Sequence, residues 1–500
     1  MSNYFYNLLK IFMINKISNT GFNFDNSYIE LPPEFYSPAN LQPVKSPQLV
    51  ILNNELSNSL GLNTDFLKSP EGIYIMSGNI KIPDGAYISQ AYAGHQFGGF
   101  TMLGDGRALL IGEQITPSNQ RFDIQLKGSG RTPYSRNGDG RAVLGPMLRE
   151  YIISEAMHGL KIPTTRSLSV ISTGENVYRE TIQQGAILTR VASSHIRFGT
   201  FEYAAYMLDY EKLKKLSDYT IKRHFPFLEN NENKYINLLD EVIKLQASLV
   251  AKWQSVGFIH GVLNTDNMSI CGETIDYGPC AFMDVYNPDT VFSSIDTNGR
   301  YAYKNQIAIV NWNLYRLAET LLPLINSDEN KAIELAQNSL SKFINLATSN
   351  LSHEMCSKIG IFEPKTSDID LLNELLNMMQ KYKEDYTNTF IALTFNDLPQ
   401  KGMFISDEFI NLKKKWEETL ILQNKSKDEV FELMKNSNPA VIPRNHRVEE
   451  ALSAANNGDF SVMNNLLKAL SNPFEHSEFQ KEYAKLPSTP QCNYRTYCGT

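Results

Sequence analysis

Two acidic residues and an amide lie close together in the stretch between His260 and Asp284. Asp266 and Asn267 are adjacent, and Asp276 begins an Asp-Tyr-Gly triplet a short distance further on. Carboxylate and amide oxygens are the donors that Mg²⁺ prefers, and this ion keeps its other positions for water and substrate phosphates. If the connection between them is a short hairpin, the three side chains can converge on one or two Mg²⁺ ions. The stretch therefore predicts phosphate chemistry.

The same stretch resembles the catalytic loop and metal-binding Asp-Phe-Gly of a protein kinase, with one change. In a kinase, an Asp two residues after the His accepts the proton of the substrate hydroxyl. Here that position is Val262, which can accept no proton. The residues leave two interpretations open: an inactive relative of kinases, or an enzyme that works on phosphates with a rearranged set of groups. In the second case Asp266 could replace the missing base.

A strand lysine and a helix glutamate upstream form a possible ion pair. Apolar residues alternate in Phe122–Lys127, so Lys127 points to the other side of a predicted strand. A helix is predicted over 141–159, and Glu150 lies on its mostly apolar stripe, where an unpaired carboxylate is costly. In kinases such a glutamate orients the lysine on the phosphates of ATP. A purely structural ion pair or an exposed glutamate stays open.

Glycines near residue 105 indicate a tight turn that could approach a phosphate. Gly104 and Gly106 lie between two predicted strands, and glycine lets backbone N–H groups come close to an anion. Arg107 follows directly, and its guanidinium can bind two phosphate oxygens at once. A plain hairpin is the alternative.

Further candidates for phosphate contacts flank the predicted helix. Asp139 and Gly140 precede its N-terminus, where backbone donors favour anions, although Asp139 could equally be the N-cap. More strands are predicted over 166–192, and Arg190 and Arg197 could together clamp a polyphosphate. Solvated arginines remain the alternative.

Composition and charge exclude several classes of protein. Hydrophobic residues make up 42% and charged residues 20% of the 500-residue chain, as in ordinary folded proteins. The net charge of −7 offers no basic footprint for nucleic acid, and no apolar run is long enough to cross a bilayer. The cysteines are few and form no Cys-x-x-Cys pair, which favours a reducing, cytoplasmic location. They are Cys271, Cys280, Cys356, Cys492 and Cys498.

The order of these features predicts an α+β, two-lobed protein-kinase-like fold. Residues 1–85 would be an N-terminal extension that packs on the core, and 86–200 a β-rich N-lobe with the nucleotide-binding loop. Residues 201–310 would be a helical C-lobe with the catalytic and metal-binding loops, and 311–500 a helical extension with a cysteine-containing tail. The first residues lack a secretory cleavage site, so they are either a leader or the result of an upstream start, with Met13 as the true one.

Several long motifs resemble the selenoprotein O family, the YdiU group of bacteria. They include AYAGHQFGGF, LGDGRA, QLKGSGRTPYSR, LTRVA, HIRFGTFE, TDNMSI, TIDYGP and PRNHRVEEAL, and they cover nearly the whole chain. The resemblance implies a pseudokinase-like fold that transfers AMP from ATP to Ser, Thr or Tyr hydroxyls of proteins and releases pyrophosphate. The nucleotide would bind turned around relative to kinases, with Mg²⁺ or Mn²⁺, and bacterial members also suggest UMP transfer from UTP with Mn²⁺.

Site residues follow from the resemblance, position by position. Asp266 would be the proton acceptor, Asn267 and Asp276 the metal ligands, and Glu150 the partner of Lys127. The ATP-binding positions would be Gly104, Gly106, Arg107, Lys127, Asp139, Gly140, Arg190 and Arg197. Two other functions stay open: a kinase that transfers phosphate to a protein or small molecule, and an inactive scaffold that binds nucleotide.

The C-terminal residues carry two further expectations. Arg444 and His446 could contact substrate, but packing is favoured. Cys498 resembles the position of the selenocysteine of eukaryotic members and could form a redox clamp with Cys271 or Cys280. Bacterial relatives can carry a cysteine where this chain has Val291-Phe-Ser-Ser, so a free tail thiol is equally open.

Overall fold

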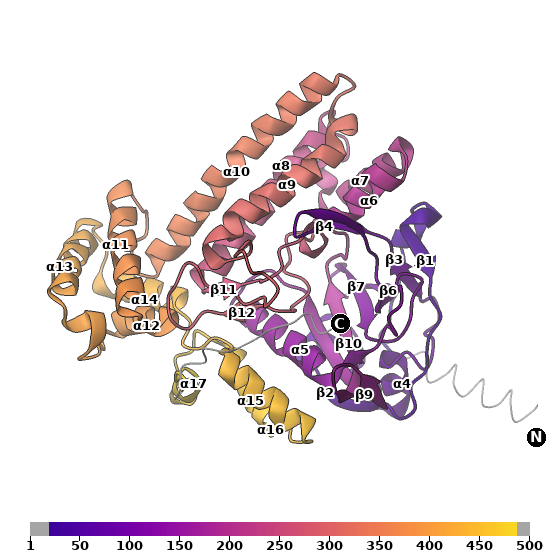
Figure 1. Cartoon of the computed structure of the whole chain (residues 1–500), viewed down its shortest axis with the longest axis horizontal. Coiled ribbons are helices and arrows are strands. Elements are labelled where there is room, and N and C mark those ends of the chain that lie inside the picture. Colours follow the sequence, from indigo (N-terminus) through magenta and orange to yellow (C-terminus); the bar gives the residue numbers. More distant parts are fainter. Residues whose placement is uncertain (1–19, 488–500) are drawn as a thin grey trace, which may run out of the picture.

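The computed structural model describes residues 20–487, and its first part is an antiparallel sheet (Figure 1). Seven strands follow the order β1-β3-β6-β7-β10-β9-β2, and β8 pairs with β10. The pair β4–β5 forms a separate hairpin. The bounds are β1 Tyr36–Pro38, β2 Gln48–Leu52, β3 Ile88–Gln90, β4 Ala93–Gln96, β5 Gly99–Met102, β6 Ala108–Ile115, β7 Arg121–Lys127, β8 Ala142–Val143, β9 Arg166–Tyr178 and β10 Ile182–Ala192.

Strand β7 shows how the sheet separates an apolar layer from a polar one. Successive side chains of a strand face opposite sides. Ile124 and Leu126 enter a hydrophobic core together with side chains of α2 (Asn54–Ser59), α3 (Thr64–Lys68) and α4 (Pro70–Met76). The alternate residues Asp123, Gln125 and Lys127 are buried on the other face. Polar groups buried in this way need partners, and the candidate site supplies them.

Helix α5 (Leu144–Gly159) lies against β9 and β10 and carries Glu150 in its buried face. It begins later than the predicted Arg141, because Ala142 and Val143 pair with β10 as strand β8. Its N-cap is Val143, so the alternative that Asp139 caps the helix is wrong.

The remainder is helical, which confirms the expected β-rich part followed by a helical part (Figure 1). A loop region between α8 and α9 holds β11 (Phe258–Ile259), β12 (Ala281–Phe282) and the 3₁₀ turn η4 (Thr265–Asn267). Among the residues described, no helix has the length and apolarity to cross a membrane. The helices are α6 Phe198–Met207, α7 Tyr210–His224, α8 Lys234–Ser255, α9 Gln306–Ile325, α10 Glu329–Ser357, α11 Thr366–Tyr382, α12 Tyr386–Phe395, α13 Asp407–Leu422, α14 Lys427–Ser437, α15 Asn445–Asn456, α16 Ser461–Leu470 and α17 Glu478–Tyr483.

Arg444, just before α15, is fully buried and has a structural role. Its guanidinium donates to Asp385 at 2.9 and 3.0 Å and to Asp284 at 2.5 Å, so it joins the C-terminal helices to the end of the loop region. The favoured expectation of packing is confirmed for this residue. Cys271 is free in the described chain, and the expected clamp with Cys498 lies outside the described residues.

Candidate active site

The centre of the site is the Asp276 carboxylate, which three cations contact. Lys127 Nζ donates to Oδ1 at 2.8 Å, and Arg190 Nη1 donates to the same oxygen at 2.5 Å. Arg197 Nη1 donates to Oδ2 at 2.6 Å. Burial opposes ionisation of Asp276, but the three cations outweigh it and hold the pKa of this carboxyl well below its ordinary value. Asp276 is therefore permanently charged near neutral pH.

The polar face of β7 positions these cations. Lys127 ends the strand, and its Nζ also donates to Glu150 Oε2 on α5 at 2.6 Å, so the structure brings together the pair that the sequence predicts. Gln125, two positions earlier on the same face, accepts from Arg190 Nη2 at 2.6 Å. Arg190, on β10, is paired directly with Gln125 where β10 runs beside β7. Neighbouring strands thus hold the lysine and an arginine in fixed directions.

Asp266 has a very different environment, although it lines the same cavity as Asp276. The residue is 7% exposed, Oδ2 accepts from Gln96 Nε2 at 3.5 Å, and Oδ1 has no hydrogen-bond partner. Burial raises the pKa of Asp266 to about 6, and Arg197 offsets this only in part. A buried carboxylate with a free oxygen is suited to accept a proton near neutral pH.

A cavity of about 380 Å³ connects these groups. Val262 lines it at the position where a kinase has its base, and Asp266 lines it as well. The other lining residues combine polar and apolar side chains. They are Gln96, Phe97, Arg107, Lys127, Pro146, Met147, Glu150, Asn264, Asn267, Asp276, Tyr277, Gly278, Pro279 and Ile295.

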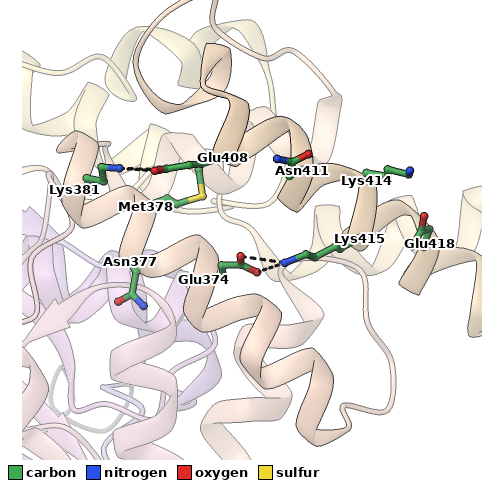
Figure 2. Close-up of a pocket in the computed structure, with 9 residues that line it drawn as sticks. All are labelled: Glu374, Asn377, Met378, Lys381, Glu408, Asn411, Lys414, Lys415 and Glu418. Atoms are coloured by element: carbon green, nitrogen blue, oxygen red, sulfur yellow. Dashed lines mark hydrogen bonds and ion pairs between the residues drawn. The ribbon is translucent and has the colours of Figure 1, made fainter.

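A larger hollow of about 840 Å³ lies between α11 and α13, away from these residues (Figure 2). Lys381 pairs with Glu408 at 2.6 Å and Lys415 with Glu374 at 3.0 Å, and all four side chains are about half exposed. It contains none of the predicted site residues. Its charges already neutralise one another in solvent, so we assign the chemistry to the smaller cavity.

The donors around the smaller cavity fit a hard divalent cation. Asp266 offers a buried oxygen without a partner, and Asp276 offers a charged carboxylate. Asn267 donates through Nδ2 to the Val262 carbonyl at 2.9 Å, which fixes the amide and leaves its oxygen available. Oxygen donors of this kind match Mg²⁺ or Mn²⁺ better than a soft metal. Within residues 20–487 no cluster of three or more His, Cys, Asp or Glu side chains forms a metal site by itself.

The predicted glycines and Asp139 do not line the cavity, and neither do Arg190 and Arg197, which are almost fully buried. A Cβ at Gly104 would come within 2.5 Å of the Tyr134 ring, and one at Gly140 within 2.1 Å of the Gly130 carbonyl oxygen. Gly106 would meet the Tyr134 carbonyl at 3.0 Å. These glycines let the glycine-rich segments pack closely next to Arg107.

Several polar residues near the site had no role in the sequence-based prediction. Asp105 is buried and accepts from Gln125 Nε2 at 3.0 Å, which turns the amide oxygen of Gln125 toward Arg190. Gln96 and Phe97 reach the cavity from the β4–β5 hairpin. In β7, Asp123, Gln125 and Lys127 alternate with apolar residues. This alternation places Gln125 on the same face as Lys127 and could have predicted its position near the site.

A strand lysine, a helix glutamate and an Asp-Tyr-Gly aspartate around one cavity match the arrangement of a kinase-type site, with Val262 at the position of the kinase base. The sequence model of a family described as "Protein adenylyltransferase SelO" matches residues 19–471. The chain belongs to this SelO family. The expected family and the expected class of enzyme, a nucleotidyltransferase, are confirmed.

Close relatives cover nearly the full length, and each is described as "Protein nucleotidyltransferase YdiU". The Bacillus cytotoxicus protein is 62% identical over 487 residues, which are 97% of this chain and 99% of the relative. The Clostridium beijerinckii protein is 60% identical over 484 residues, again 97% and 99%. The protein of Bacillus thuringiensis subsp. konkukian is 59% identical over 489 residues, 97% and 100%.

Among solved structures, ROP2 from Toxoplasma gondii, described as a virulence factor with a protein-kinase fold and no enzymatic activity, matches at 8% identity. It covers 67% of this chain and 88% of that one, with a TM-score of 0.24. This likeness is too weak to support a statement about function.

Proposed function

We propose that this chain transfers AMP from ATP to Ser, Thr or Tyr hydroxyls of proteins and releases pyrophosphate. The observation that carries the proposal is Asp266, a buried carboxylate with a free oxygen beside the cation-bound Asp276. Val262 replaces the usual kinase base, so the acceptor hydroxyl must approach from a different place. The position of the base alone does not select the phosphorus, and the family description "Protein adenylyltransferase SelO" supports attack at the α-phosphorus.

Asp266 takes the proton of the acceptor hydroxyl in this proposal. Its pKa of about 6 leaves it mostly ionised at neutral pH and still basic enough to accept a proton. The hydroxyl oxygen then forms the bond to the α-phosphorus, and the bond from that phosphorus to pyrophosphate breaks in line.

Lys127, at the cavity, stabilises the charge of the phosphates directly, and the buried Arg190 and Arg197 add positive charge from beside Asp276. They are fixed by Glu150, Gln125 and Asp276, so little reorganisation is needed when charge develops on the leaving group. Arg107, at the cavity wall, supplies a further cation. We assign Gly104, Gly106, Asp139 and Gly140 an indirect part, shaping the segments that hold Arg107 and the nucleotide.

Asn267 and Asp276 would hold Mg²⁺ or Mn²⁺, because they offer an available amide oxygen and a charged carboxylate on the same cavity. Such an ion neutralises phosphate oxygens and the departing pyrophosphate. The relatives' description as nucleotidyltransferases does not name the nucleotide, so UTP with Mn²⁺ belongs in the test.

The acceptors in this proposal are cytoplasmic proteins. Cys271 and Cys356 are free thiols among the described residues, which agrees with a reducing compartment.

The test uses ATP labelled at the α- or the γ-phosphate, with Mg²⁺ or Mn²⁺, and β-casein as an unfolded acceptor beside the chain itself. AMP transfer retains the α-label and adds the mass of AMP to peptides in mass spectrometry. Transfer of the γ-label would identify a kinase and overturn the proposal. Neither label, together with measurable ATP binding, would identify a nucleotide-binding scaffold. Parallel α-labelled UTP with Mn²⁺ measures the preference between AMP and UMP.

A further inference from the structure

A buried carboxylate outside the cavity joins three segments of the chain that meet at Asp266. Glu202 on α6 has a fully buried side chain. Its Oε1 lies 2.7 Å from His95 Nδ1 on β4, and its Oε2 accepts from Thr265 Oγ1 on η4 at 2.8 Å. The ring of contacts closes because the His95 backbone N–H donates to Thr265 Oγ1 at 2.7 Å. Burial raises the pKa of Glu202, and the contacts with Thr265 and His95 oppose that shift.

The β4–β5 hairpin and α6 each approach Asp266, which belongs to η4, closely at a glycine. A Cβ at Gly94, the residue before His95, would lie 2.7 Å from Asp266 Oδ1. A Cβ at Gly199, on α6, would lie 2.0 Å from the Ala93 carbonyl oxygen and 3.4 Å from Asp266 Cα. No side chain fits at either glycine, so the hairpin and α6 pack directly against Asp266.

We propose that Glu202, His95 and Thr265 are positioning residues that fix the direction of the Asp266 carboxylate. None of them lines the cavity, so they act on the reaction through Asp266. The inference rests on the proposed role of Asp266 as the base. A displacement of about 1 Å in such a group can cost on the order of 100-fold in rate, although substrate binding is unchanged.

Thr265 offers the most selective variants. Thr265→Val keeps the shape of the side chain but removes the hydroxyl that both donates to Glu202 and accepts from His95. Thr265→Ser keeps the hydroxyl and removes a methyl group. We expect Thr265→Val to lower the single-turnover rate of AMP transfer about 10- to 100-fold at saturating ATP, with an unchanged Kd for ATP. Thr265→Ser should retain most of the rate.

A second pair of variants tests the same contact from the hairpin, should Thr265→Val fail to fold. His95→Asn keeps a donor close to the position of Nδ1, whereas His95→Leu removes it. We expect His95→Asn to recover most of the rate that His95→Leu loses. The ring of His95 also packs edge-on against Trp312, with centroids 5.5 Å apart. Thr265→Val keeps this ring contact, so a change in tryptophan fluorescence in Thr265→Val reports that the hairpin has left its position.

The outcomes separate the positioning role from the proposed function. If the wild-type chain transfers no AMP, the proposed function is overturned and the inference with it. If the wild-type chain transfers AMP and both Thr265→Val and His95→Leu keep the wild-type rate, the positioning role alone is overturned. A loss shared equally by Thr265→Val and Thr265→Ser, or a loss of ATP affinity instead of rate, would also contradict it and indicate a structural role.

Discussion

Asp276 and Asp266 line the same cavity, yet their surroundings shift the pKa values of the two carboxylates in opposite directions. Three cations contact Asp276, and the pKa of this group is held well below its ordinary value. Asp266 has one long side-chain contact and a free oxygen, and its pKa is raised to about 6. One carboxylate is a fixed negative charge, and the other can exchange a proton near physiological pH.

The difference comes from the elements that carry each residue. Asp276 lies next to the ends of β7 and β10. Lys127 at the end of β7 and Arg190 near the end of β10 both donate to its carboxylate. Asp266 lies under the β4–β5 hairpin against Gly94, and Arg197 donates to its backbone carbonyl at 2.6 Å but not to its carboxylate. Environments that push the pKa values of two neighbouring acids apart are typical of a division between charge stabilisation and proton transfer.

Removal of the charge of Asp276 should have the largest effect. Asp276→Asn leaves Lys127, Arg190 and Arg197 without their shared counter-charge, which should lower the free energy of unfolding by about 3–5 kcal/mol and abolish AMP transfer. Urea denaturation and transfer of α-label measure the two effects. Near-normal transfer in this variant would show that Asp276 is neither the charge centre nor a metal ligand.

Asparagine is the better replacement here because Asp276 has a left-handed backbone with φ of 62°. Asparagine tolerates this conformation more readily than alanine does. Asp276→Ala would add backbone strain to the loss of charge, so a larger loss of stability in Asp276→Ala than in Asp276→Asn measures that strain.

Asp266→Asn should separate activity from stability. We expect the rate of AMP transfer to fall about 100- to 10,000-fold because the proton acceptor is lost. The free energy of unfolding should instead rise by about 1–3 kcal/mol at pH 8 in EDTA, since the fold no longer has to bury an ionised carboxylate. A stable variant with the wild-type rate would exclude Asp266 as the base.

The sign of the stability effect depends on pH. The folded pKa of about 6 lies above the ordinary value of 3.8, so the folded state favours the protonated acid. Below about pH 3.8 the acid is protonated in both states and carries no penalty. The penalty grows as pH rises to about 6 and is then constant. The advantage of Asp266→Asn in urea denaturation should therefore be small at pH 4 and complete at pH 8.

The pH dependence of the wild-type reaction should reflect Asp266 and not Asp276. We expect kcat/KM to fall about tenfold per pH unit below about pH 6, because Asp266 must be ionised to accept a proton. Burial also raises the pKa of Asp105 to about 6, but this residue does not line the cavity. Asp105→Asn is thus the matched control, and it should keep the acid limb. If kcat/KM of Asp105→Asn no longer falls at low pH, the fall in the wild-type profile comes from Asp105.

The sequence predicted the residues of the site that belong to local patterns. Lys127 ends an alternating strand, Glu150 interrupts an apolar helical stripe, and Asp276 begins a short loop motif. Strand and helix periodicity show which way such side chains point, so their meeting could be foreseen. The helix start at Arg141 was wrong because pairing of Ala142 with β10 overrode local helical preference.

The contacts of Glu202 could not be predicted in this way. Its partners His95 and Thr265 are 107 and 63 residues away in the chain. Its place beside Phe198 and Phe201 on α6 indicates burial, but its partners become defined only when the β4–β5 hairpin and η4 pack on the helix. Contacts of this kind depend on the tertiary fold rather than on periodicity.

The smallest effect should come from Asp139, which the sequence proposed as a nucleotide contact. Its carboxylate pairs with Arg179 at 2.9 Å, and the Asp139 side chain is about half exposed. Exposed ion pairs contribute about 0–1 kcal/mol to stability, so Asp139→Asn should change the free energy of unfolding within that range. Because Asp139 lies outside the cavity lining, we expect the Kd for ATP, measured by calorimetry, to change far less than in Lys127→Met. If Asp139→Asn weakens ATP binding as strongly as Lys127→Met, the glycine-rich segment closes onto the nucleotide, and the site has a fourth functional carboxylate beside Glu150, Asp266 and Asp276.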